Sequence, residues 1–389
     1  LVFVGAGAAP TFATGAGNLS FSNNLTAGEF RCTTPGVMIQ FEAGSEYSIT
    51  NFQVHGASNS LIVLRSSASP APWRLNVSRW ASVAHVDAQD SDASGGLTIV
   101  PVLSQNSGNN TNWDFGASGS WITWTGGASS SFTNPANWYP AGAPGPGSLV
   151  LIETNGAYAP VITTAVTVAQ LLIGGIGTGL VTLAANQPLT VSGDLTILTN
   201  AALTHSANGT VATNRVQATV GGNVVVRGAI NADYKGYAAA SGVFTGTRTG
   251  YGPGGGWTSS NGGPGRGSGG GHGGVGGECT DDPSPPYKAG GGAYGSVTSP
   301  ITLGSSGGAG HYDPQSNQGG GAVQLTIAGD LVNDGFITCN GRNRAGVDSE
   351  GIWAGGGAGG SIYVTCNQLS GGGWIRANGG AADTGYAGG

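Results

Sequence analysis

The chain is short of charge, and lysine is the scarcest of its charged residues. Only 8% of its 389 residues are charged, and the basic ones are two lysines, Lys235 and Lys288, and eleven scattered arginines. The net charge at pH 7 is −6. Because no basic stripe is present that could neutralise a phosphate backbone, nucleic acid is not an expected partner.

Long apolar runs are also missing. No stretch approaches the roughly 18 consecutive apolar residues of a membrane helix, so we expect no membrane span. The chain opens LVFVGAGAAP, without Met and without a basic start followed by an apolar core and a cleavage site. We interpret it as a processed or excerpted chain.

Cysteine is rare, and its spacing does not suit a zinc site. The four cysteines are Cys32, Cys279, Cys339 and Cys366. The last two occupy apolar positions of the repeat described next, so we expect both to point inward. A Cys339–Cys366 bridge between neighbouring repeats is one arrangement open to them, and it would fit an oxidising, extracellular setting.

The sequence does contain an internal repeat, a pattern of apolar residues and glycines that recurs at fixed offsets. Residues 322–341, AVQLTIAGDLVNDGFITCNG, recur in residues 361–379 at a shift of 38 with one residue deleted, and in residues 216–233 at a shift of 107 without a gap. A looser copy covers residues 189–209. The gapless alignment places four apolar residues on four others: Val216, Val220, Val224 and Ile230 on Val323, Ile327, Leu331 and Ile337.

Each copy has the pattern of short strands separated by turns. Val323, Leu325 and Ile327 alternate with polar residues, the two-residue period of a half-buried strand. Gly329 and Gly335 interrupt that alternation. Such units cannot bury their apolar face alone, so repeated copies predict a stack. We therefore predict an all-β fold, a β-solenoid and specifically a right-handed parallel β-helix, with coils of about 20 to 25 residues.

Composition divides the chain into three sections. Residues 1–115 form an N-terminal β-helix section, residues 116–215 a middle solenoid section, and residues 216–389 the glycine-rich repeats. Glycine is concentrated between about residues 250 and 320. That tract is either a flexible loop or an excursion whose glycines let backbones pack closely on the solenoid.

Several segments resemble known proteins. The order FEAGSEYSITNFQVHG, LIVLRSSASPAPWRLNVS, SVAHVDAQDSDASGG and NSGNNTNWDF, over roughly residues 40–115, resembles a segment of large secreted or surface bacterial right-handed β-helix proteins. The later WTGGASSSFTNPANWYPAGAPGPGSLVLI and the glycine-rich repeats are similar to units of autotransporter-like and adhesin-like proteins. The resemblance implies a β-helix at the cell surface or outside the cell, and it carries no activity.

The densest acidic cluster consists of Asp87, Asp90 and Asp92. Paired carboxylates on a β-helix could perform acid and base chemistry on a glycosidic bond. Asp90, Asp92 and Ser94 before Gly95 also resemble the first half of a calcium loop, although the bidentate acid expected near Pro101 is absent. The alternative is a structural turn in which aspartates cap backbone amides.

The remaining candidates are weaker. Gly271-His272-Gly273 resembles a polygalacturonase motif but lies in a glycine tract, and no nucleotide or cofactor fingerprint is present. Four tryptophans near the first section boundary could stack on sugars or seal the junction: Trp113, Trp121, Trp124 and Trp138. Five Asn-x-Ser/Thr triplets are candidate glycan acceptors: Asn18, Asn24, Asn76, Asn109 and Asn208.

These patterns favour a structural protein over an enzyme. We predict an extracellular or cell-surface protein, a filament or adhesin subunit that associates end to end with copies of itself and has no cofactor apart from the calcium candidate. Surface glycans are further candidate partners. The apolar start of the chain, LVFVG, is predicted to cover the open end of a neighbouring copy by strand addition. The alternative is a carbohydrate-active β-helix enzyme or a sugar-binding module.

Overall fold

The structure is a computed structural model of the 389-residue chain. It describes residues 2–4 (backbone only), 18–57, 59–115, 121–175, 179–239, 250–258, 267–279, 289–309, 317–343 and 354–381. The fold is all-β with parallel sheets, as the alternating apolar pattern predicts. Contacts divide the chain into two units, Leu1–Trp121 and Ile122–Gly389.

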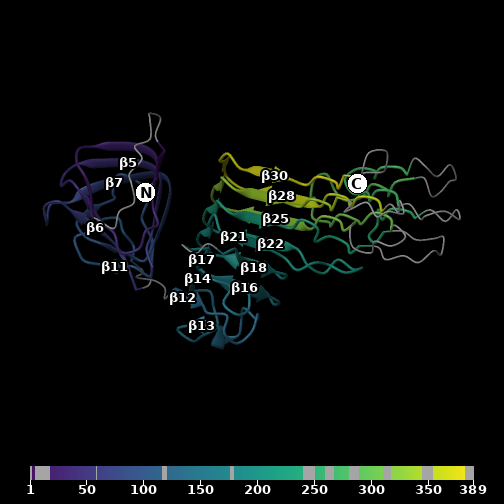
Figure 1. The fold of residues 1–389 in the computed structure, drawn as a ribbon, viewed down its shortest axis with the longest axis horizontal. Coiled ribbons are helices and arrows are strands. Elements are labelled where there is room, and N and C mark those ends of the chain that lie inside the picture. Colours follow the sequence, from purple (N-terminus) through teal and green to yellow (C-terminus); the bar gives the residue numbers. More distant parts are fainter. Residues whose placement is uncertain are drawn as a thin grey trace, which may run out of the picture. The chain divides into compact units, whose positions relative to one another are not determined.

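Unit 1 is built from two sheets, drawn in purple and blue in Figure 1. The first contains, in spatial order, β1 (Val2–Val4), β3 (Leu25–Cys32), β5 (Glu46–His55), β7 (Trp73–Ala84) and β10 (Pro101–Val102), with β9 (Ser91–Asp92) also paired to β7. The second contains β11 (Gln105–Asn106), β8 (Val86–Ala88), β6 (Ile62–Ser66), β4 (Met38–Phe41) and β2 (Leu19–Phe21). From β1 to β9 the strands alternate between the two sheets along the chain. Their side chains enclose one core that includes Phe41 stacked on Trp73 at 4.0 Å between ring centroids.

The strand at the start of the chain is already paired within the chain. β1 lies antiparallel against β3, with Val2 opposite Arg31 and Val4 opposite Glu29. The start of the chain therefore pairs within its own molecule, and its covering of a neighbouring copy stays a prediction. Its backbone groups face β3 of the same molecule, where it protects an edge that would otherwise be open to strand addition.

Unit 2 contains three sheets. The longest runs β13 (Trp138–Tyr139), β12 (Trp121–Trp124), β14 (Leu149–Ile152), β17 (Gln170–Ile173), β20 (Leu195–Ile197), β23 (Val224–Val226), β26 (Leu331–Asn333) and β29 (Leu369–Ser370). The second runs β15 (Val161–Ile162), β18 (Val181–Ala185), β21 (Ala201–Thr204), β24 (Ala229–Asn231), β27 (Phe336–Thr338) and β30 (Trp374–Arg376). The third runs β16 (Val166–Val168), β19 (Leu189–Val191), β22 (Val216–Val220), β25 (Ala322–Ile327) and β28 (Ser361–Thr365). One 3₁₀ turn, Pro135–Asn137, is the helix found among the described residues.

From β14 onward, neighbours in each sheet are three strands apart in chain order and parallel. In Figure 1 these strands follow one another in chain order from β14 to β30. Their register confirms the repeat alignment, because Val216 lies opposite Val323, Val224 opposite Leu331, and Ile230 opposite Ile337. Ile337 in turn lies opposite Ile375. Residues that the repeat alignment places on one another are thus partners in neighbouring strands.

One core runs through unit 2 from Trp124 to Cys339, with Ile362, Val364 and Cys366 packed against its last layer. The boundary that the sequence suggested at residue 215 lies inside this unit, where β22 pairs with β19 on one side and β25 on the other. Outside the core, polar side chains link the turns that precede neighbouring strands of one sheet. Asp194 Oδ1 accepts the N–H of Asn223 at 2.7 Å, and Asn223 Oδ1 accepts the N–H of Asp330 at 2.9 Å.

The four cysteines all lie among the described residues, and none of them forms a disulfide. The Cys339 thiol is buried and donates to the carbonyl of Ser361, and burial raises its pKa well above the ordinary value. Cys366 is half-buried against the same core. Both residues face inward as predicted, but the Cys339–Cys366 bridge is not formed in this structure.

Many of the described glycines in the tract are buried and lie directly against other backbone segments. Gly271 donates to the carbonyl of Gly254 at 2.7 Å, and Gly276 donates to that of Gly291 at 2.9 Å. A β-carbon on Gly271 would lie 2.3 Å from the Gly291 oxygen, closer than side chains tolerate. Glycine is therefore required because the backbones approach one another directly. This supports the packed interpretation for the described residues, and the remainder of the tract lies outside them.

Candidate functional site

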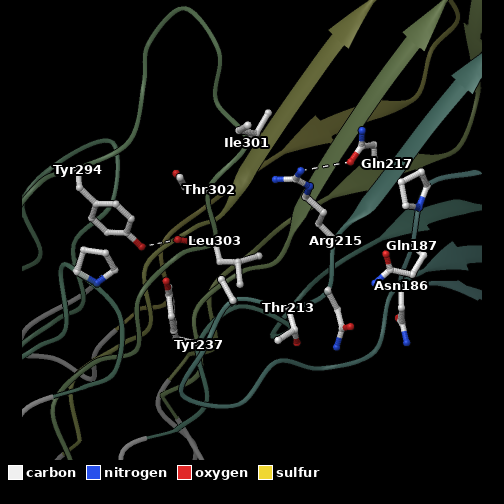
Figure 2. A pocket seen from close by; sticks show the side chains of 14 residues that line it. Asn186, Gln187, Thr213, Arg215, Gln217, Tyr237, Tyr294, Ile301, Thr302 and Leu303 are labelled. Atoms are coloured by element: carbon white, nitrogen blue, oxygen red, sulfur yellow. Dashed lines mark hydrogen bonds between the residues drawn. The ribbon is translucent and has the colours of Figure 1, made fainter. Parts of the chain in front are cut away.

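The candidate site is a pocket in unit 2 of about 500 Å³, between the start of β22 and the glycine tract. The first wall comes from the turns before β19 and β22 and from β22 itself, and includes Asn186, Gln187, Thr213, Asn214, Arg215 and Gln217. The second comes from the glycine tract and its approach, and includes Tyr237, Pro253, Tyr294, Ile301, Thr302 and Leu303. Figure 2 shows the two tyrosines on one side of the view and Arg215, Gln217, Gln187 and Asn186 on the other.

Asn208 holds the turn that carries the polar wall. Its Oδ1 accepts the N–H groups of Thr213 at 2.8 Å and Asn214 at 2.7 Å. Its Nδ2 donates to the carbonyls of Asn214 at 2.9 Å and Lys235 at 2.8 Å. Because the side chain is buried and bonded on both ends, it fixes the path of the chain into Arg215.

On the tyrosine wall, hydrogen bonds and a ring contact fix the position of Tyr294. The Tyr294 hydroxyl donates to the carbonyl of Leu303 and accepts from Ser305 Oγ at 2.9 Å. The ring of Tyr294 meets that of His272 edge to face at 4.8 Å between centroids. Burial raises the pKa of Tyr294 far above its usual range, so the phenol stays protonated and can serve as a fixed donor. The ring therefore presents one defined surface to the pocket.

Arg215 carries the single formal charge among the lining residues. Its Nη2 donates to Gln217 Oε1 at 3.2 Å, which orients the guanidinium along the polar wall. The lining includes no Asp or Glu. A cation without a neighbouring carboxylate gives this pocket a positive potential, although the whole chain is acidic.

The predicted acidic cluster lies in unit 1, away from this pocket in the chain, and each of its carboxylates has its own partner. Asp87 forms an ion pair with Arg65 at 2.5 Å and accepts from Ser107 Oγ at 2.6 Å. Asp90 is buried and accepts from Asn109 Nδ2 at 2.8 Å. The three side chains bond different partners: Asp87 bonds Arg65 on β6, Asp90 bonds Asn109, and Asp92 bonds Ser94 of its own turn.

The calcium candidate has the geometry of a capped turn. Asp92 Oδ1 accepts the backbone N–H of Ser94 at 3.0 Å and its hydroxyl at 2.6 Å. These hydrogen bonds lower the pKa of Asp92. This arrangement matches the structural alternative for Asp90, Asp92 and Ser94. Among the described residues, no group of three or more His, Cys, Asp or Glu side chains is placed to hold a metal ion; calcium binding stays a prediction.

The buried tryptophans belong to the cores of both units. Trp124 and Trp138 are buried in unit 2, edge to face at 5.0 Å between centroids. Trp113 packs into the core of unit 1 and stacks on Phe115. Trp121, at the start of β12, is half-buried. The three buried rings fill interiors, as the structural interpretation expects, and do not offer faces to a sugar.

The candidate glycan acceptors differ in exposure. Asn18, Asn24 and Asn109 are exposed, although Asn109 also donates to the Pro70 carbonyl at 2.7 Å. Asn76 is half-buried on β7. Asn208 is 6% exposed, and its amide nitrogen donates to the carbonyls of Asn214 and Lys235. The folded chain therefore does not present this side chain to solvent.

His272 of the Gly-His-Gly triplet bonds Thr302 Oγ1 through Nε2 at 2.8 Å and lies beneath the pocket's Tyr294 ring. Sequence reasoning missed Arg215 and both pocket tyrosines, since the lining is assembled from segments far apart in the chain.

The described residues contain no helix that is long and apolar enough to cross a membrane. No protein-family model, curated protein or solved structure matches this chain.

Proposed function

We propose that the chain is an extracellular structural protein, a β-solenoid that serves as a surface filament or adhesin subunit and associates end to end with copies of itself, with the edge formed by β28, β29 and β30 as one of the two contact surfaces. We further propose a right-handed parallel β-helix, because parallel crossovers are right-handed in nearly all proteins. The support for the solenoid is the pairing of strands three apart around one continuous core.

The observation that carries the proposed association is the change in exposure at the last layer. Ile337 is fully buried, whereas Ile375, its partner in the next strand, is 42% exposed. Leu369 is 54% exposed and Trp374 is 51% exposed. An edge of three parallel strands with apolar side chains at its rim is a template for another strand layer.

The enzymatic alternative needed Asp87, Asp90 and Asp92 to line one open groove. Their separate hydrogen bonds to different partners weigh against it. We therefore propose a structural role for these three carboxylates in holding the turns of unit 1.

The test is electron microscopy of the purified chain together with sedimentation velocity over a range of concentrations. We expect end-to-end assemblies that are lost in Ile375→Lys. Val297→Lys is the matched control, because Val297 is 97% exposed and lies in the glycine tract. Particles that stay single at all concentrations, or assembly that persists in Ile375→Lys, would refute association through this edge.

A further inference from the structure

The pocket between β22 and the glycine tract has the composition of a sugar site. Its volume of about 500 Å³ falls in the range of small-molecule sites. One side offers the rings of Tyr237 and Tyr294, and the other offers planar amides and the guanidinium of Arg215. Flat rings suit the C–H face of a pyranose, and planar polar groups suit its hydroxyls.

The aromatic side is rigid, which favours binding. The Tyr294 hydroxyl is anchored by Leu303 and Ser305. The Tyr237 ring lies against Gly252, where an added β-carbon would approach it to 2.6 Å. Because the structure already holds both rings, a ligand would lose little affinity to ordering them.

The polar side selects for negative charge. One N–H of Arg215 is used by Gln217, which leaves the planar fork able to offer further donors to a ligand. A guanidinium matches a carboxylate in bidentate geometry. The lining has no acidic side chain that would compete for it.

The pocket is poorly suited to binding a peptide by strand addition. The N–H groups of Thr213 and Asn214 bond Asn208, and the N–H of Tyr237 bonds the carbonyl of Gly304 at 3.1 Å. These backbone groups are already satisfied, so they do not offer the edge that strand addition requires.

We propose that this pocket binds a hexuronic acid unit of an acidic polysaccharide, with the sugar carboxylate on Arg215 and the pyranose ring against the tyrosines. Such binding would attach the protein to an acidic glycan. It is independent of the proposed self-association, because none of the pocket residues lies on β28, β29 or β30.

The experiment compares two ligands by isothermal titration calorimetry, cellotriose and its C6-oxidised form, tri-glucuronate. The two share linkage and ring stereochemistry and differ in the carboxylates. We expect tri-glucuronate to bind at least about tenfold more tightly, since a charge-assisted hydrogen bond contributes that much or more. Equal affinity, no binding of tri-glucuronate, or tighter binding of a tri-glutamate peptide would overturn the proposal.

Variants then locate the site. Arg215→Gln should lose the preference for tri-glucuronate, Arg215→Lys should retain part of it, and Tyr237→Leu should weaken both sugars. The matched control is Arg74→Gln, which removes an exposed arginine from unit 1 and should change neither affinity. Unchanged tri-glucuronate binding in both Arg215 variants would refute the assignment. Filament formation should be unaffected in Arg215→Gln, so a failure here is distinguishable from a failure of the proposed assembly.

Discussion

Two isoleucines that pair in one sheet of unit 2 test whether burial in the core of this unit determines how much a side chain stabilises the fold. Ile337 on β27 and Ile375 on β30 are direct partners in a parallel sheet. Ile337 is fully buried and Ile375 is 42% exposed. Truncating a buried isoleucine to alanine costs about 3 kcal/mol, from lost burial and from the cavity left behind. Since a little over half of Ile375 is covered, its truncation should cost about half as much.

Because stability in a stack varies from layer to layer, the assay should be local. In Ile337→Ala the free energy of local unfolding should fall by about 3 kcal/mol. Hydrogen exchange of peptides covering β26 and β27 should therefore become about 100-fold faster. Ile375→Ala should speed exchange in β30 by a smaller factor. Equal effects at low protein concentration would refute the reasoning. If the proposed assembly forms, the cost of Ile375→Ala should rise with concentration towards that of Ile337→Ala, because the neighbouring copy would bury the side chain.

Two further predictions concern the glycine tract and a buried histidine. Gly271→Ala places a β-carbon 2.3 Å from the Gly291 oxygen, whereas Gly273 has no heavy atom within 4 Å of that position. We expect Gly271→Ala to destabilise the tract by about 1–3 kcal/mol and to speed its proteolysis, with Gly273→Ala near neutral; equal proteolysis of the two variants would contradict direct backbone packing. Burial lowers the pKa of His205 to about 4 from 6.5, with Lys235 Nζ donating to the His205 carbonyl at 2.7 Å. As pH falls, the histidine of the unfolded chain is protonated before that of the folded chain. The neutral His205 therefore does not reduce the free energy of unfolding above pH 6.5, and this free energy falls by about 3 kcal/mol between pH 6.5 and about 4. Urea unfolding of the wild type and His205→Asn across this range should show a shallower pH dependence in the variant, and parallel curves would contradict it.

Sequence spacing determined much of the fold, because side-chain period and strand pairing are local and repetitive. The shift of 107 residues paired Val216 with Val323 and Ile230 with Ile337, and the structure has those partners. Alternation within residues 322–327 placed Val323, Leu325 and Ile327 inside, and each is buried. A two-residue period and a repeated unit thus carry register as well as strand content.

The use of individual polar residues could not be predicted in this way. Asp87, Asp90 and Asp92 fall within six residues of sequence, yet their side chains bond three different partners, Arg65, Asn109 and Ser94. Asn208 fits a glycosylation triplet but is buried as the clamp of the pocket wall. The start of the chain was predicted to pair as a strand with a neighbouring copy, and its described residues, Val2–Val4, pair with β3 of the same chain.

The pocket was decided by tertiary structure alone. Arg215 and Tyr294 are 79 positions apart in the chain (294 minus 215), and they line one pocket beside described glycines whose backbones lie directly against one another. Local periodicity determined which side chains face the core. Long-range packing decided which polar groups meet outside the core. These contacts depend on where an irregular segment packs in the fold, and the sequence pattern of that segment does not specify this.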